Sequence, residues 1–301
     1  MNNKRRLFST VLCVAALTAG LFVSGCGSDK AGGIGSVVSS VVDGGDEKAA
    51  AKLNTLIDAT NRFNSDNVSF AQFQAEGLAK LKGGFAEGAI TNQPHFDRLQ
   101  ADLEKAKKEG STFKEVDAER DNVLNILNEL VPVYKDLTAY DDSKAYMNDG
   151  GAKGKELAAK YVAAVEKFDA AYAKFNEVLN KVNAEQSKKQ IEKLKKDGKK
   201  GYAAAMESTL RLTTLVDNLE KAPQKADKAA VEKELSEIEA LLKSINNDRG
   251  QVLADRYNSV VGDVRQVLAD PSDNNLNNMI EGFNGYIDTY NSTNPDQFDA
   301  K

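Results

Sequence analysis

The chain has 301 residues, a formal net charge of −5, 28% charged residues and no tryptophan. That length suffices for one large domain or two small ones with substantial cores. The acidic balance argues against a nucleic acid partner, since nucleic-acid binding requires a net basic surface. A zinc site made of several His or Cys ligands lacks its donors, because the chain has one histidine and two cysteines.

Residues 1–25 have the order of a bacterial export signal. MNNKRR is positively charged, and the run LFSTVLCVAALTAGLFV that follows is mostly apolar and leads into small residues. This run is at the short limit for a membrane-spanning helix, which favours a signal peptide. We therefore predict a lipoprotein signal peptide over 1–25. The alternatives are an uncleaved signal anchor and an ordinary signal followed by a coincidental cysteine.

The end of this segment, Val23-Ser24-Gly25-Cys26, resembles a bacterial lipobox, with Val23 where the usual residue is Leu. The resemblance implies cleavage between Gly25 and Cys26 and a diacylglyceryl group on the Cys26 thiol, often with a further acyl chain, such as palmitate, on the α-amine. Two or more acyl chains hold a protein stably at a membrane, whereas one binds reversibly. Cys26 is thus the predicted lipidation site, and the membrane is the predicted partner.

The residue after Cys26 bears on the location. It is Gly27 and not the Asp that tends to retain a lipoprotein at the inner membrane. We therefore expect a cell-envelope protein on the outer membrane, facing the periplasm, if the source has two membranes. The other cysteine, Cys13, lies in the segment that we expect to be removed. A single lipidated cysteine then excludes a disulfide and thiol catalysis in the mature chain.

Residues 26–45 are predicted to form the lipidated cysteine and a flexible tether. The sequence GSDKAGGIGSVVSSVVDGG, residues 27–45, contains six glycines and four serines. Coil statistics give such a linker an r.m.s. span of about 24 Å. Its inner part, IGSVVSSVV, is more apolar than a typical linker, so local pairing or contact with the membrane is the alternative.

Over residues 46–294 the apolar residues recur at helical spacing, and no stretch alternates as a strand does. We predict one all-α domain there, an antiparallel multi-helix bundle with coiled-coil-like heptad seams and about six to eight helices. Pro132 is expected to kink its helix or to begin a new one. The first three apolar stripes are Leu53, Ile57, Thr60 and Phe63; Phe96, Leu99, Leu103 and Ala106; and Val116, Val123, Leu127, Leu130, Tyr134 and Leu137.

The clearest pattern follows a break at Gly150, Gly151 and Gly154. Its residues are spaced alternately by four and three: Tyr161, Val165, Phe168, Tyr172, Phe175, Leu179 and Val182. A repeat of 3.5 residues predicts left-handed supercoiling against a partner helix.

Four later stripes predict helices over about 202–220, 231–245, 253–267 and 276–290. The breaks between most helices are short, which favours one continuous domain. Two stacked bundles, joined near residue 110 or 200, are the alternative. Residues 295–301 are predicted to be a disordered tail.

The stretch from about Tyr134 to Phe175 combines an aromatic-rich helix, a segment rich in Tyr and Asp, and a helix start of the form G-x-K-G-K-E-L. With the lipobox-like motif and the closing FNGYIDTYN (283–291), it resembles YiiG-like bacterial lipoproteins, a family built on a domain of unknown function. The resemblance covers about 50–292. It implies a lipid-anchored helical envelope protein and supplies no catalytic residue.

One segment is strongly basic. SKKQIEKLKKDGKKGY (187–202) carries seven lysines against two acids. It is a possible interaction surface for anionic lipid, an anionic envelope polymer or an envelope protein. A solvated helix end is the alternative. The residues of this predicted surface are Lys193, Lys195, Lys196, Lys199 and Lys200.

Other polar motifs do not indicate a site. His95 lies near a helix start, as capping or surface residues do. GGAKGKE (150–156) lacks the first glycine and the final hydroxyl of a phosphate loop. The pairs Asp141/Asp142 and Asp270/Asp273 lack the spacing of an EF-hand loop. We therefore predict no metal, no cofactor and no catalytic residue.

Three functions remain as hypotheses. The leading one is a non-enzymatic, lipid-anchored envelope protein that presents a helical bundle for binding or structural interaction. The second is a module that captures a small molecule or peptide between its helices. The third is a hydrolase of envelope polymers with paired carboxylates, which would require two Asp or Glu side chains with perturbed pKa values in one cleft.

Overall fold

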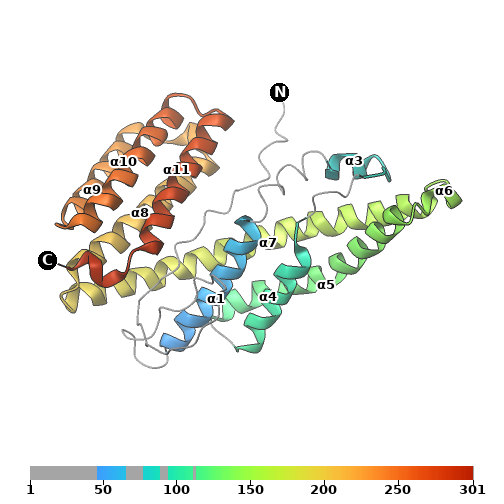
Figure 1. The fold of residues 1–301 in the computed structure, drawn as a ribbon, viewed down its shortest axis with the longest axis horizontal. Helices are drawn as coiled ribbons and strands as arrows, with labels where there is room; N and C mark the ends of the chain where they lie inside the picture. Colours follow the sequence, from blue (N-terminus) through green and yellow to red (C-terminus); the bar gives the residue numbers. More distant parts are fainter. Residues whose placement is uncertain (1–45, 66–76, 89–93, 111–112, 301) are drawn as a thin grey trace. The chain divides into compact units, whose positions relative to one another are not determined.

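The computed structural model describes residues 46–65, 77–88, 94–110 and 113–300. Every regular element in these ranges is helical (Figure 1), which confirms the all-α prediction. Eight of the described helices have at least seven residues, within the predicted six to eight. The predicted signal peptide, Cys26 and the tether lie outside the described ranges.

The chain divides into two compact units, and the continuous stretches Thr55–Asn180 and Lys181–Lys301 form their bodies. We expected one continuous domain, or two bundles joined near residue 110 or 200. The division lies at neither of those two positions. It falls within the longest helix, α7 (Ala152–Lys196).

The first unit is organised around aromatic side chains from three helices. Phe63 on α1 (Asp46–Ser65), Phe96 on α4 (Phe96–Lys108) and Phe168 on α7 are all buried. The ring of Phe168 lies 5.7 Å from that of Phe63 and 5.0 Å from that of Phe96, both edge-on. Such pairs add about 0.5–1.5 kcal/mol beyond the apolar area that they bury.

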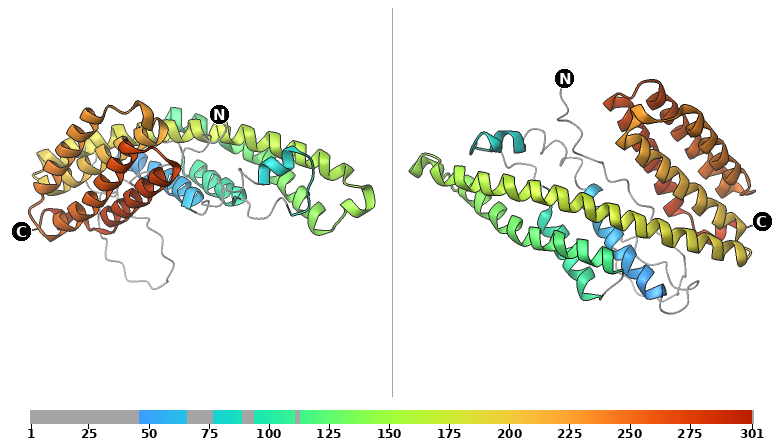
Figure 2. Two further views of the ribbon diagram at one scale, coloured as in Figure 1. Left: turned by 90° about the horizontal axis from the view of Figure 1, so that it is seen from above. Right: turned by 180° about the vertical axis from the view of Figure 1, so that it is seen from behind.

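Helix α5 (Lys114–Asp142) runs antiparallel to the first part of α7, and the short α6 (Tyr146–Asp149) lies in their connection (Figures 1 and 2). All seven residues of the predicted α7 seam are buried, so this stripe faces a core as expected, while its left-handed supercoiling stays a prediction. Helix α5 continues through Pro132, so this proline does not begin a new helix, which was one of the two expectations. Pro132 is exposed, so water can satisfy the carbonyl group that a proline leaves without a donor.

The break between α5 and α7 has a packing role. Gly150 and Gly151 adopt positive φ angles of 63° and 84°, which glycine tolerates without strain. Gly154 lies inside α7, and a Cβ atom there would be 2.6 Å from Cγ of Phe85 and 2.5 Å from Cε1 of Tyr140. The absence of a side chain at Gly154 therefore allows Phe85 to pack edge-on against Tyr140, with a ring distance of 5.1 Å. Phe85 follows the short helix α3 (Ala79–Lys82).

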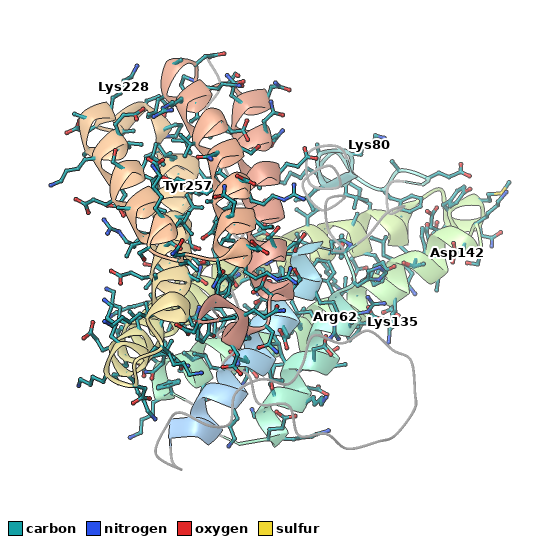
Figure 3. The ribbon with its side chains drawn as sticks, turned by 60° about the vertical axis from the view of Figure 1, so that its left-hand side comes forward. Arg62, Lys80, Lys135, Asp142, Lys228 and Tyr257 are labelled. Atoms are coloured by element: carbon teal, nitrogen blue, oxygen red, sulfur yellow. The ribbon has the colours of Figure 1, made fainter. Side chains whose placement is uncertain are left out.

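The second unit contains a four-helix bundle in which consecutive helices pack together and the last packs on the first. The helices are α8 (Lys200–Lys221), α9 (Lys228–Lys243), α10 (Asp248–Ala269) and α11 (Asp273–Ser292). Their apolar stripes form one buried core. Within it, Tyr257, labelled in Figure 3, donates its hydroxyl hydrogen to the carbonyl oxygen of Leu235 at 2.5 Å.

Side-chain caps explain where two of these helices begin. Asp227 accepts hydrogen bonds from the backbone N–H groups of Ala229 and Ala230, and Asn247 accepts from those of Arg249 and Gly250. Such caps satisfy donors that have no partner within the helix. The turn before α9 contains the short 3₁₀-helix η2 (Pro223–Lys225).

The prediction of a disordered tail is wrong for residues 295–300. Pro295–Phe298 form the 3₁₀-helix η3, and Phe298 is buried in the core of the bundle. The side chain of Asn294 caps this turn through the backbone N–H of Asp296, at 3.0 Å. The prediction failed because a short polar segment with one apolar residue has no periodicity, and long-range contacts order it.

Candidate functional site

A groove of about 530 Å³ runs between α8 and α9 in the second unit. Leu215, Leu219 and Val231 line it and belong to the buried core. Small residues from the connection and from the start of α9 widen it, because their side chains occupy little space: Ala222, Ala226 and Ala230.

One end of the groove carries an ion-pair network between the two helices. The guanidinium group of Arg211 on α8 donates two hydrogen bonds of 2.7 Å to the carboxylate of Glu234 on α9, and a third to Glu237. The bonds to Arg211 lower the pKa of Glu234 and outweigh the opposing effect of its burial. Glu234 is thus held as a carboxylate, and such bidentate pairs are geometrically specific.

The other end lies at the connection between the helices. Lys225 is exposed there, and Asp227 has its carboxylate occupied by the first N–H groups of α9. Lys228, the first residue of α9, is labelled in Figure 3. Between the two charged ends, Thr214 and Asn218 contribute exposed polar side chains.

This arrangement suits binding better than hydrolysis. An apolar floor with charged ends fits a ligand that has an apolar body and polar ends. Both carboxylates that line the groove are engaged, Glu234 by Arg211 and Asp227 by backbone N–H groups. A general acid needs a raised pKa, whereas the pKa of Glu234 is lowered.

Two carboxylates with raised pKa values lie elsewhere. Burial raises the pKa of Asp58 to about 6, although Arg62 opposes the shift. Burial and then the charge of Glu281 raise the pKa of Asp263. Asp58 is on α1 and Asp263 on α10, and neither lines the groove.

The five lysines of the predicted interaction surface lie around the turn from α7 to α8. Lys195 pairs with Glu207 at 2.8 Å, and Lys199 pairs with Asp296 at 2.8 Å. These contacts raise the pKa of both lysines. Lys196 and Lys200 are exposed, and Lys193 is half-buried. The fold therefore brings carboxylates to a segment that is strongly basic in the sequence, and this reduces its positive charge.

Gly25 and Cys26 lie outside the described residues, so cleavage and lipidation stay predictions. His95 is exposed at the start of α4, and its side chain makes no capping hydrogen bond. Asp141 accepts a hydrogen bond from the N–H of Gly88, and Asp270 from the side chain of Asn275. These two acids serve turns and helix ends.

The groove residues were not predicted. The only local signal was the spacing of Ala222, Ala226 and Ala230 around Pro223, and small residues at that spacing occur in many helix connections. Over the described ranges, no group of three or more His, Cys, Asp or Glu side chains is placed to hold a metal ion. In the same part of the chain, none of the helices has the length and apolar character to cross a bilayer.

Comparison with known proteins finds one family. Residues 47–252 match the model of a family described as "Protein of unknown function (DUF3829)". This match covers α1 through the start of α10 and includes both walls of the groove. No curated protein and no solved structure matches the chain.

Proposed function

On the premise that the chain belongs to the DUF3829 family of proteins of unknown function, we propose that it is a lipid-anchored protein of the bacterial cell envelope whose helical units serve binding or structural interaction. We also propose that the protein is a YiiG-like lipoprotein. In a source with two membranes, it would lie at the outer membrane and face the periplasm. A non-enzymatic role is proposed as well.

The observation that carries the proposal is the position of Cys26. It directly follows the sequence Val23-Ser24-Gly25 at the end of an apolar run with a basic start. Residues 27–45 separate it from Asp46, where α1 begins. A linker of this composition would let a body attached through acyl chains reach about 24 Å from its anchor.

Acyl labelling in bacterial cells tests the anchor. Cells that express the full chain are fed an alkyne-bearing fatty acid, and the purified protein is examined for label and for its N-terminal mass. We expect label on the wild-type chain and on the Cys13→Ser variant, because Cys13 lies in the segment to be removed. The Cys26→Ser variant should carry no label and should leave the membrane fraction. Label that persists on Cys26→Ser would contradict the assignment.

A capture module is the second candidate, because of the groove between α8 and α9. The chain has no tryptophan, so one introduced tryptophan gives an unambiguous fluorescence signal. Asn218→Trp places the reporter in the groove, and Ser236→Trp places a matched reporter at an exposed position of α9 outside the groove-lining residues. Amphipathic peptides and small amphiphiles should change the emission of the first reporter alone. Equal responses from both reporters would count against this function.

A further inference from the structure

The C-terminal segment Asn294–Ala300 packs on parts of the second unit that are distant from it in sequence. It follows α11 after the single residue Thr293 and contacts both the first turn of α8 and the start of α10. The segment makes three kinds of contact. Its aromatic ring lies in a pocket, its carboxylate accepts hydrogen bonds from backbone N–H groups, and its backbone carbonyl oxygens accept hydrogen bonds from one amide side chain. Peptide ligands are recognised by contacts of these kinds.

The ring is that of Phe298. It stacks on Tyr202 of α8 at a ring distance of 6.2 Å and an angle of 4°, and on Tyr290 of α11 at 6.2 Å and 23°. All three residues are at most 5% exposed. Phe298 therefore fills a pocket whose walls come from two other helices.

The carboxylate is that of Asp299. It accepts hydrogen bonds from the backbone N–H of Gly201 at 2.7 Å and of Tyr202 at 3.3 Å. These are N–H groups in the first turn of α8, which have no acceptor within the helix and favour a negative charge. Gly201 is required for the approach, since a Cβ atom there would lie 2.0 Å from the carbonyl oxygen of Phe298.

The amide is that of Asn247, the capping residue of α10. Its nitrogen donates to the carbonyl oxygens of Gln297, Phe298 and Ala300 at 3.1, 3.0 and 3.0 Å. Its oxygen meanwhile accepts from the start of α10. The same side chain thus holds the segment and begins a helix. Outside these contacts, Asp296 reaches Lys199 with a carboxylate that is 81% exposed.

We propose that the end of the bundle is a peptide-binding site and that the chain's own C-terminal segment occupies it as a releasable ligand. The pocket for Phe298, the N–H groups for Asp299 and the amide of Asn247 all belong to the bundle and not to the segment. The segment itself contributes one buried ring and one short turn. Its release leaves α8–α11 connected through their own core and uncovers the pocket.

The test uses the full chain with its own segment disabled by Phe298→Ala and Asp299→Ala. A fluorescent peptide with the sequence of residues 293–301, TNPDQFDAK, is titrated into this variant and into the wild-type chain. A short connection gives a tethered segment an effective concentration on the order of millimolar, so the wild-type chain should bind the added peptide at least about tenfold more weakly. A peptide with Ala in place of Phe298 should also lose at least about tenfold in affinity for the variant.

Asp296→Ala is the matched control in the full chain. It removes a neighbouring carboxylate whose contact is exposed, so the segment should stay in place and the added peptide should bind as weakly as to wild type. The proposal is overturned if the disabled variant, folded by circular dichroism, does not bind the peptide. It is also overturned if the wild-type chain and the variant bind it equally.

Hydrogen exchange on the unaltered chain gives an answer even if the variant does not fold. The N–H groups of Gly201 and Tyr202 should exchange at least about tenfold faster than those of the α10 core around Tyr257, because release of the segment exposes them without unfolding the bundle. Exchange of both sets at the same slow rate would show that the segment leaves only on global unfolding, and would overturn the proposal.

Discussion

The hydroxyl oxygen of Tyr286 lies 3.1 Å from Oγ1 of Thr209, and both residues are buried between α11 and α8. Oγ of Ser208 is 3.2 Å from the same hydroxyl. Ser208 and Thr209 each donate to the carbonyl oxygen of Ala205 at 2.8 Å. The three hydroxyl groups thus form one buried polar cluster inside the core of the bundle.

Loss of the Tyr286 hydroxyl should cost little, because Ser208 and Thr209 keep Ala205 as their acceptor. We expect Tyr286→Phe to lower the free energy of unfolding by about 1 kcal/mol, and Tyr286→Ala to lower it by about 3–5 kcal/mol through the cavity. Urea unfolding measures both values. Tyr134→Phe, at a half-buried position of α5, is the control and should change the value by less than about 0.5 kcal/mol. A loss from Tyr286→Phe as large as that from Tyr286→Ala would contradict this account.

Alkaline pH should destabilise the second unit. Burial raises the pKa of Tyr286 to about 12 and also raises the pKa values of Tyr257 and Tyr290. The folded state therefore holds these protons above the ordinary tyrosine pKa of 10.0, at which the unfolded chain releases them. The contribution of these groups to the free energy of unfolding is fully present below about pH 10. It falls as pH rises towards 12, by about 1.4 kcal/mol per pH unit for each group.

A spectroscopic titration checks this prediction. The tyrosinate absorbance of the three residues should appear together with the loss of helical circular dichroism and not before it. The Tyr286→Phe variant should show a shallower fall of stability with pH, since it lacks one of the three groups. Ionisation of all nine tyrosines near their ordinary pKa, with the helices intact, is the result that would disprove it.

Gly154 should not tolerate a methyl group. A Cβ atom there would approach Phe85 and Tyr140 to 2.6 and 2.5 Å, and overpacking of this kind costs about 1–3 kcal/mol. The higher helix propensity of Ala offsets at most about 1 kcal/mol of that cost. Gly154→Ala should therefore lower the thermal midpoint of the first unit.

Gly262→Ala is the matched control, also in a helix interior but with nothing within 4 Å of its Cβ position. It should stabilise the second unit by about 0.5–1 kcal/mol, because only the propensity changes. If both variants shifted stability in the same direction, the close approach of Phe85 would not be the reason for the glycine.

Asp58 should make the first unit less stable at neutral pH than at acid pH. Burial raises its pKa from the ordinary value of 3.8 to about 6, so the folded state favours the protonated form. The stability from this group is complete below pH 3.8 and falls as pH rises to about 6. Asp58→Asn removes the charge, and after allowance for solvent screening we expect a gain of about 1 kcal/mol at pH 7.

At pH 4 the same substitution should have little effect, because Asp58 is then mostly protonated in the folded protein. Thermal unfolding at the two pH values gives the comparison. Asp136→Asn, at an exposed position of α5, is the control and should shift stability by less than about 0.5 kcal/mol at either pH. A gain from Asp58→Asn that is equal at both pH values would mean that burial of the charge is not the cause.

The helices could be predicted from the sequence because their signal is local. The side chains that face the core recur every three or four residues, so each stripe needs only its own segment to be recognised. The seam from Tyr161 to Val182 is the clearest case, and all of its residues are buried. The lipid anchor at Cys26 is also a local pattern and stays a prediction from sequence.

The groove and the C-terminal site were decided by tertiary structure. The groove is lined by residues of two helices, α8 and α9, whose side chains Arg211 and Glu234 meet only in the folded chain. Phe298 is ordered because Gly201, Tyr202 and Asn247 lie beside it. Residues 295–301 were predicted to be disordered because one Phe among polar residues has no period to detect. The need for glycine at position 154 is likewise explained only by the position of Phe85 in the folded chain. Helical periodicity can be detected from residues that are close in sequence, whereas contacts between residues distant in sequence arise only when the chain is folded.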